Sequence, residues 1–267
     1  MEKSIKDCIR SRRSVRTFSG SLSDEDKSKI ELLLTKTDNP FGVKVEFRFL
    51  QASEYKLTSP VIVGADHYVA AKVSREPRWE IAFGYSFEKF CLLVCDIDLG
   101  TVMLAATLNR GAFEEALQVG ENEVMPVATP IGRIAEKMSL MERIMRKGTK
   151  ADTRLPFDEL FFDKSFDRGL LPEQAGKYQE ALEMLRLAPS AVNKQPWRVV
   201  MDGETLHFYE KKNSIANHKM GDIQKVDIGI ALAHFDLTLR EEGREGEFFE
   251  QNPKIQTELE YIISYRG

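Results

Sequence analysis

The stretch PSAVNKQPW, residues 189–197, lies between a segment with helical periodicity and a short apolar segment that is typical of a strand. It has two interpretations. It is an ordinary connection if Pro189 only ends the helix and Trp197 only packs in the core, because proline, serine and asparagine are common loop residues. It is a binding loop if the rigid elements on either side hold its polar side chains toward a ligand. The order of its residues, together with a second stretch near the N-terminus, favours the binding loop.

The composition indicates a globular protein without a membrane or nucleic-acid partner. Of the 267 residues, 30% are charged and 42% are hydrophobic, and the net charge is -4. No apolar run reaches the roughly 18 residues of a membrane span, and the first residues lack the apolar region of a signal peptide. No basic tract is longer than Arg12-Arg13, which argues against a nucleic-acid surface. We therefore expect a soluble protein of the cytoplasm.

The cysteines fit a reducing compartment, because Cys8, Cys91 and Cys95 are odd in number. Cys91 and Cys95 are four residues apart on an expected helix, which raises the idea of a metal or redox site. A zinc site would need two further ligands. The four histidines are too scattered to supply them, at positions His67, His207, His218 and His234. We expect buried, inert thiols and no metal site.

The second stretch is RRSVRTF, residues 12–18, which follows an expected helix at 4–11. Three arginines and a serine at a helix end form a potential anion site, because guanidinium groups and a hydroxyl suit phosphate oxygens. The alternative for this stretch alone is a solvated basic patch.

Apolar periodicity and turn residues predict an alternation of helices and strands. We expect a helix capped by Ser23 and ended by residues 38–40, and further helices at 81–99, 113–117, 133–146, 172–187 and 227–239, the last stopped by Gly243. Strands are expected at 43–50, 60–65, 101–107, 124–131, 197–201 and 206–209, with a hairpin turn at 202–203. Residues 257–265 fit a short helix or a strand. The methionines within 133–146 indicate gap-filling core or a lid.

A weak internal repeat divides the chain into two halves. Each half is expected to run helix, strand, long buried helix, and the order of the matches agrees with these elements, although chance remains an alternative for so few matches. We expect one unit made of the half-repeats 1–165 and 166–267. At an offset of 149, Leu22, Leu33 and Pro40 match Leu171, Leu182 and Pro189; at an offset of 145, Gly84, Phe90 and Leu92 match Gly229, Phe235 and Leu237.

The two halves keep different polar features. The first half has the arginines of 12–16 but carries Pro40-Phe41-Gly42 where the second has PSAVNKQPW. The second half has that loop and no counterpart of the arginines. The sequence therefore predicts one composite site, built across the interface between the halves.

These two stretches resemble the motifs RRSxRxF and PSxxNxQPW of the FMN-dependent nitroreductase family. Four further segments resemble the same family in the same order: GYSFEKF at 84–90, DLGTVMLAATLNRGAFEEAL at 98–117, MPVATPIG at 125–132 and RLPFDELFF at 154–162. The resemblance covers nearly the whole chain. It implies an α+β fold in which antiparallel sheets are flanked by helices.

The spacing of the two motifs departs from ordinary members of the family. Those members carry them close together and form the active site between two identical subunits, whereas here Arg16 and Pro189 are 173 positions apart. This arrangement resembles the fused subgroup, in which an internal pseudo-two-fold repeat lets one chain mimic the usual homodimer. The resemblance thus implies a monomer.

The resemblance also implies the residues that bind FMN. Arg16 would support the reduced ring at its N1/O2 edge, since a fixed cation there favours the added negative charge. Many members have two glycines where this chain has Ala105-Ala106, which would shift the backbone near the flavin. The phosphate would be bound by Arg12, Arg13, Ser14, Lys150 and Arg154, the ring or ribityl chain by Pro189, Ser190, Ala191, Asn193 and Gln195, the N5 side by Leu104, Ala105, Ala106 and Thr107, and the ring flank by Pro130, Ile131 and Gly132.

The implied activity is that of an FMN-dependent NAD(P)H oxidoreductase. A hydride from NAD(P)H would pass through flavin N5 to a nitroaromatic, a quinone or a similar small-molecule acceptor in a ping-pong cycle. We expect no catalytic side chain, because the flavin carries the chemistry. Residues 133–153 would form a lid. The alternatives are a flavin-binding or ligand-binding protein without turnover, and a relative that fragments the flavin or dehalogenates a substrate.

Overall fold

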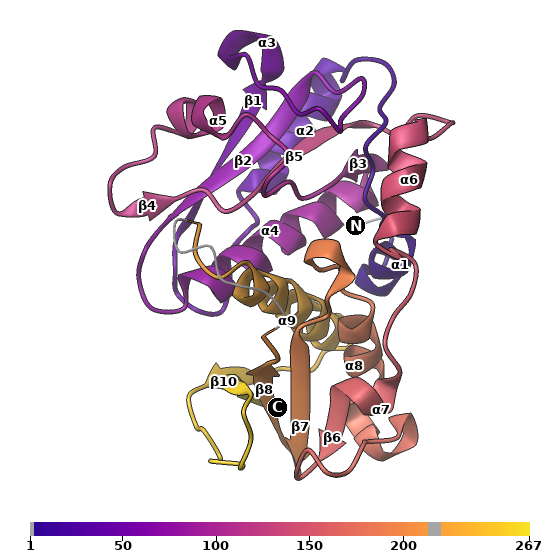
Figure 1. Cartoon of the computed structure of the whole chain (residues 1–267), viewed down its shortest axis with the longest axis vertical. Coiled ribbons are helices and arrows are strands. Elements are labelled where there is room, and N and C mark those ends of the chain that lie inside the picture. The colour runs from indigo at the N-terminus through magenta and orange to yellow at the C-terminus, as the bar shows by residue number, and fades with distance from the viewer. Residues whose placement is uncertain (1–2, 213–219) are drawn as a thin grey trace.

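The computed structural model describes residues 3–212 and 220–267 of the chain. One of the four scattered histidines, His218, lies outside these residues. In Figure 1 two sheets lie at opposite ends of the molecule, with a pair of long helices between them. The helices are α4, Trp79–Asp96, and α9, Ile223–Glu241.

The first sheet has the strand order β1-β2-β5-β3, and every pairing within it is antiparallel. Its strands are β1 (Val45–Gln51), β2 (His67–Ser74), β3 (Leu99–Thr101), β4 (Glu123–Val124, paired with β2) and β5 (Ala128–Arg133). The helices that accompany it are α2 (Asp24–Leu34), α3 (Ala52–Tyr55) and α5 (Arg110–Leu117).

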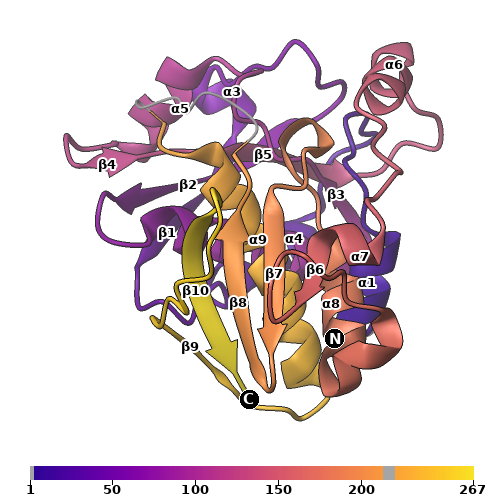
Figure 2. The same ribbon diagram turned by 60° about the horizontal axis from the view of Figure 1, so that its bottom comes forward.

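The second sheet has the order β6-β7-β8-β10-β9 and is seen in the foreground of Figure 2. The expected antiparallel pairing is confirmed except between β6 and β7, which are parallel. Its strands are β6 (Phe161–Asp163), β7 (Trp197–Asp202), β8 (Thr205–Glu210), β9 (Glu247–Phe249) and β10 (Glu260–Arg266). The remaining helices are α1 (Ile5–Ser11), α6 (Leu140–Gly148), α7 (Phe157–Leu160), the 3-10 helices η1 (Pro172–Tyr178) and η2 (Ala191–Asn193), and α8 (Gln179–Arg186).

Two glycines let α4 and α9 pack closely. A Cβ added to Gly84 of α4 would lie 2.0 Å from the carbonyl oxygen of Val226, and one added to Gly229 of α9 would lie 2.1 Å from that of Ile81. In each case the carbonyl that the added Cβ would clash with belongs to the residue three positions before the glycine of the other helix. The two glycines that match in the sequence therefore occupy reciprocal positions in the helix contact.

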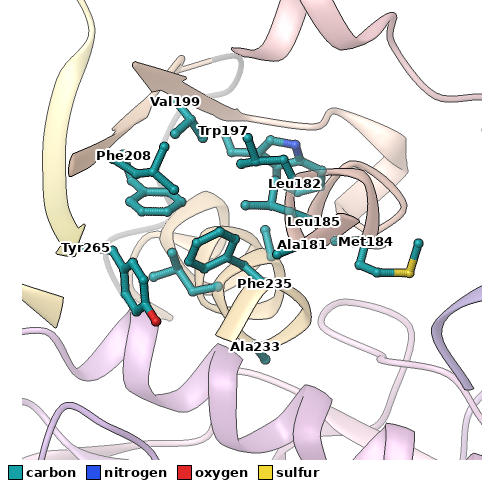
Figure 3. Close-up of a cluster of buried hydrophobic side chains, with 14 of the residues drawn as sticks. Ala181, Leu182, Met184, Leu185, Trp197, Val199, Phe208, Ala233, Phe235 and Tyr265 are labelled. Atoms are coloured by element: carbon teal, nitrogen blue, oxygen red, sulfur yellow. The ribbon is translucent and has the colours of Figure 1, made fainter. Parts of the chain in front are cut away.

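The core beside the second sheet is built from aromatic side chains of α9 and the strands (Figure 3). The ring of Phe235 packs edge-on against Tyr265, with centroids 4.9 Å apart, and lies 5.6 Å from the ring of Phe208. Trp197, the last residue of the PSAVNKQPW loop, is fully buried in this core. Trp197 therefore packs in the core, as the first interpretation of the loop expects, and anchors the loop there.

Several expected elements are confirmed. Ser23 forms a capping box with Asp26 at the start of α2, and β7 and β8 form the expected hairpin. The helix α9 ends at Glu241, two residues before Gly243. Residues 257–265 contribute a strand, β10, and not a helix.

Other expectations were wrong. Residues 60–65 form turns with a single bridge between Val63 and Thr17, and the strand β2 follows instead. The sequence HYVAAKVS of β2 is buried on both faces, so it lacks the alternation that marks a half-buried strand. The expected strand 101–107 stops at Thr101, beyond which Leu104 forms only an isolated bridge with Ala128.

Two expected helices begin or break elsewhere. Arg133, where a helix was expected to begin, is the last residue of the strand β5, and α6 starts only after Ser139, whose hydroxyl accepts a hydrogen bond from the amide of Glu142 at 3.2 Å. The helix expected at 172–187 is divided into the 3-10 helix η1 and the helix α8, and η1 is interrupted at Gly176, which has φ 54° and ψ -126°.

None of the described helices has the length and apolarity that crossing a bilayer requires. Among the described residues, no three His, Cys, Asp or Glu side chains gather as a metal site would need. Cys8 and Cys91 are buried and Cys95 is half-buried, and all three thiols are free.

Candidate functional site

A cavity of two adjoining lobes lies where RRSVRTF meets PSAVNKQPW. The basic lobe has a volume of about 270 Å³ and the apolar lobe about 140 Å³. They adjoin because both are lined by Arg12, Ser14, Arg16, Pro189, Ser190 and Val192.

The two lobes differ in character. The basic lobe is lined by six arginines, Arg10, Arg12, Arg13, Arg16, Arg146 and Arg154. The apolar lobe is lined by Val102, Met103, Ala105, Val127, Ile223, Val226 and Ile230.

The arginine segment is held in an extended conformation against the first sheet. The amide of Val15 donates to the carbonyl of Thr101 in β3, and the amide of Phe18 donates to that of Val63. Since α1 ends at Ser11, the following residues turn toward the cavity from a fixed position.

A network of buried polar side chains holds Arg12 in place. Its Nε lies 3.1 Å from Oε1 of Glu88, a residue of α4 with no exposed surface. The same oxygen lies 2.8 Å from Nε2 of His234 in α9, whose Nδ1 lies 3.0 Å from the carbonyl of Met184. Arg12 is therefore joined to both central helices.

Glu142 of α6 fixes the next residues from the opposite side. Its carboxylate is buried, lies 3.0 Å from Nη1 of Arg13, and accepts hydrogen bonds from the amide of Arg16 at 3.1 Å and the hydroxyl of Thr17 at 2.8 Å. The helix α6 is thus held against the arginine segment through the carboxylate of Glu142.

Two arginines of the cavity have no carboxylate within ion-pair distance among the described residues, Arg16 and Arg154. Burial lowers the pKa of both guanidinium groups, and the nearby charges of Arg12 and Arg186 lower that of Arg154 further. Arg154 instead donates to backbone carbonyls, including that of Leu187 at 2.9 Å. Nε of Arg16 is buried and has no hydrogen-bond partner within residues 3–212 and 220–267. The cavity therefore carries positive charge that the described acidic groups do not neutralise.

The PSAVNKQPW loop forms the other wall, and its backbone is unusual. Val192, Asn193 and Gln195 have φ values of 45°, 58° and 49°, a region that is costly for valine in particular. The amide of Gln195 donates to the hydroxyl of Ser190 at 2.9 Å, which closes the loop on itself. Strained residues held by such contacts are more frequent at binding sites than elsewhere.

Asn193 and Gln195 tie the loop to the segment that precedes α7. The side-chain amide of Asn193 donates to the carbonyls of Lys150 at 2.8 Å and Thr153 at 3.0 Å. The amide of Leu155 donates to Oε1 of Gln195 at 2.9 Å. These side chains therefore hold Arg154 against the loop.

The structure brings together ten of the eighteen residues that the sequence assigned to the flavin. The residues that line one or both lobes are Arg12, Arg13, Ser14, Arg16, Ala105, Arg154, Pro189, Ser190, Ala191 and Asn193.

The other eight line neither lobe. Leu104 is buried and paired with Ala128, and Pro130, Ile131 and Gly132 are paired within β5, so they support the wall from behind. The carbonyl of Thr107 accepts a hydrogen bond from Ser59, Gln195 is buried behind the loop, and Lys150 contributes its carbonyl to Asn193. Ala106 is also absent from the lining.

Sequence reasoning missed further lining residues. Arg10 belongs to a helix whose periodicity gives no hint of the site, Arg146 lies in the stretch 133–153 that is expected as a lid and not as lining, and the apolar lining residues look like any core residue. One signal was available, because Asp227 is a carboxylate within an otherwise apolar stretch of α9. The other lining residues outside the predicted set are Ile9, Thr149, Ala151, Asp152 and Leu187 of the basic lobe, Val192 of both lobes, and Val102, Met103, Val127, Ile223, Val226 and Ile230 of the apolar lobe.

Glu210 at the end of β8 makes stability depend on pH. Its side chain is buried, neither oxygen has a hydrogen-bond partner among the described residues, and burial, with the nearby Asp222 and Glu260, raises its pKa to about 7. An unfolded chain loses this proton near pH 4.3. Between those values the folded state holds a proton that the unfolded state has lost, so the free energy of unfolding falls as the pH rises.

We expect Glu210→Gln to remove this dependence. Between pH 5 and pH 8 the free energy of unfolding of the variant should rise relative to that of the wild type, because glutamine cannot ionise. Urea unfolding at the two pH values measures the gap, and a gap of constant size would show that Glu210 is ionised in the folded protein.

The comparisons with known proteins agree with this fold. A crystal structure from Thermotoga maritima MSB8, described as a putative nitroreductase, matches with a TM-score of 0.65 and 20% identity, covering 99% of this chain and 93% of that chain. A nitroreductase family protein from Clostridium novyi NT matches with a TM-score of 0.44 and 16% identity, over 53% of this chain and 92% of its own. An FMN-dependent nitroreductase from Clostridium difficile R20291 matches with a TM-score of 0.41 and 15% identity, covering 52% of this chain and 94% of that chain.

No curated protein matches the chain. The family described as "Putative TM nitroreductase" matches residues 4–239. That range contains both walls of the cavity, the whole of α4, and α9 up to its last two residues. The chain belongs to this nitroreductase family and has the α+β nitroreductase fold.

Proposed function

We propose that the chain binds FMN in the two-lobed cavity and works as an NAD(P)H-dependent oxidoreductase. The observation that carries the proposal is the junction of an arginine-lined lobe with an apolar lobe, because FMN joins a phosphate to a planar, largely apolar ring. The two volumes together fall within the range of small-molecule sites, about 300–1,000 Å³.

The residues present fit this cofactor. Arginines bind phosphate through paired N–H donors, and Arg16 and Arg154 have no acidic partner among the described residues that would compete. The apolar lobe offers Met103, Val127 and Ile230 to the faces of a ring. The strained PSAVNKQPW loop supplies Ser190 and Asn193 at the junction.

When bound, FMN would supply hydride transfer from NAD(P)H to a nitroaromatic, a quinone or a similar acceptor. The protein's own contributions are binding, orientation and electrostatics. Arg16, whose buried Nε lacks a partner, would stabilise negative charge on the reduced ring. The helix α6, which Glu142 holds against the arginine segment, would act as the lid that limits access to the cavity.

We further propose that the chain is a fused pseudo-dimer made of the half-repeats 1–165 and 166–267. Support comes from the reciprocal contacts of Gly84 and Gly229 and from the two sheets on opposite sides of α4 and α9. Each wall of the cavity then comes from one half. The strand β6 lies within residues 1–165 but pairs with β7 of the second sheet. The chain therefore passes from the first sheet to the second near residue 161.

Absorbance spectra of the purified protein, followed by anaerobic mixing, test this function. Titration with FMN should give a saturable shift of the flavin bands, and NADH or NADPH should then bleach them until an acceptor is added. Absence of any FMN binding would overturn the proposal. Binding without bleaching by either nicotinamide would leave a flavin-binding protein without turnover.

A further inference from the structure

The carboxyl group of Asp227 occupies an unusual place in the apolar lobe. The residue is 4% exposed, lies in the second turn of α9, and lines this lobe beside Val226 and Ile230. Of the described charged residues that line the cavity, Asp227 is the one confined to the apolar lobe, since Arg12 and Arg16 also line the basic lobe. A ligand with its phosphate among the arginines would extend its other end toward Asp227.

The hydrogen bonds of Asp227 leave part of its capacity unused. The amide of Ala191 donates to both carboxyl oxygens, at 3.1 and 3.0 Å. No cation forms an ion pair with this carboxyl among the described residues. Burial raises its pKa well above the ordinary value, and the charges of Asp222 and Glu210 add to this effect.

A neutral carboxylic acid carries one O–H donor next to one acceptor oxygen. The amide of Ala191 is a donor and can satisfy only the acceptor side. None of the hydrogen bonds among the described residues has the O–H of Asp227 as its donor, and a buried donor left unpaired is unfavourable. A ligand that places an acceptor there removes this cost.

We propose that Asp227 recognises the imide edge of a heteroaromatic ring, in which an N–H stands beside a carbonyl. The carboxyl O–H would donate to the ring carbonyl, and the carboxyl oxygen would accept from the ring N–H. In the proposed cofactor this edge is N3–H with the C4 or C2 carbonyl. The dimethylbenzene edge of the same ring has no acceptor and would leave the O–H unpaired. This inference rests on the proposed binding of FMN.

A purely structural role is the competing explanation, because Asp227 also holds Ala191 in the PSAVNKQPW loop. Loss of that support would weaken the binding of every flavin alike. Loss of recognition would change the preference between flavins that differ only at the imide edge. The ratio of two dissociation constants therefore separates the two roles.

The experiment compares FMN with N3-methyl-FMN, in which a methyl group replaces the N3 hydrogen. Dissociation constants are measured by flavin fluorescence for the wild type, Asp227→Asn and Asp227→Ala. Asparagine keeps a donor and an acceptor at the same place, whereas alanine removes both and leaves room for the methyl group.

We expect the wild type to bind FMN at least about 10-fold more tightly than N3-methyl-FMN. Asp227→Asn should keep most of this preference, and in Asp227→Ala the ratio should fall to nearly one. The inference is overturned if the wild type binds both flavins equally, if Asp227→Ala keeps the full ratio, or if Asp227→Asn loses it. Failure of the wild type to bind FMN at all would instead refute the proposed function itself.

Discussion

Replacing Gly84 by alanine is expected to lower the free energy of unfolding by about 2 kcal/mol or more. The added Cβ would lie 2.0 Å from the carbonyl oxygen of Val226 and 3.1 Å from Cα of Gly229, so α4 and α9 would have to separate. Overpacking of this kind costs about 1–3 kcal/mol and occasionally more, against a gain of at most ~1 kcal/mol from alanine in a helix. Urea unfolding followed by circular dichroism measures the change.

The reciprocal contact gives this prediction two controls. Gly229→Ala should destabilise by a similar amount, because its Cβ would lie 2.1 Å from the carbonyl oxygen of Ile81. Gly111→Ala in α5 meets no atom within 4 Å and should leave stability unchanged or raise it by up to ~1 kcal/mol. Equal effects of Gly84→Ala and Gly111→Ala would show that the two central helices do not pack in this way.

Replacing Arg154 by alanine is expected to raise the dissociation constant of FMN by a factor of about 10–100. Arg154 lines the basic lobe, has no acidic partner among the described residues, and is held in place by the carbonyl of Leu187. A phosphate gains a charge-assisted hydrogen bond from such a group at little cost in side-chain freedom. Fluorescence titration of the variant with FMN gives the change.

Riboflavin provides the matched control, because it has the same ring and lacks the phosphate. Its affinity should change little in Arg154→Ala. The variant Arg168→Ala removes an arginine that pairs with Asp163 outside the cavity and should bind FMN as the wild type does. If Arg154→Ala weakens FMN and riboflavin by the same factor, Arg154 supports the loop and not the phosphate.

The sequence was most informative where short motifs carry their own geometry. RRSVRTF and PSAVNKQPW predicted the two walls of the cavity, and most of their polar residues line it. The match of Gly84 with Gly229 also had structural meaning, since the two residues face each other's helix. In both cases two features of the sequence taken together were more informative than either one alone.

Prediction failed where burial removes the pattern or where distant segments meet. The strand β2 has no alternation because both of its faces are covered. The resemblance places Leu104 to Thr107 and residues 130–132 beside the ring; of these Ala105 lines the cavity, and the contact of the others with a ring stays a prediction. Arg146 and Asp227 enter the cavity from helices far apart in the chain, and the sequence does not show that the two helices meet there.

We propose that one chain builds a whole flavin site from its two halves. The decisive measurement is light scattering combined with FMN absorbance on a purified, FMN-saturated sample. We expect a 30.5 kDa monomer that carries one FMN per chain. A monomer that binds no FMN, or FMN found only on a dimer, would contradict it.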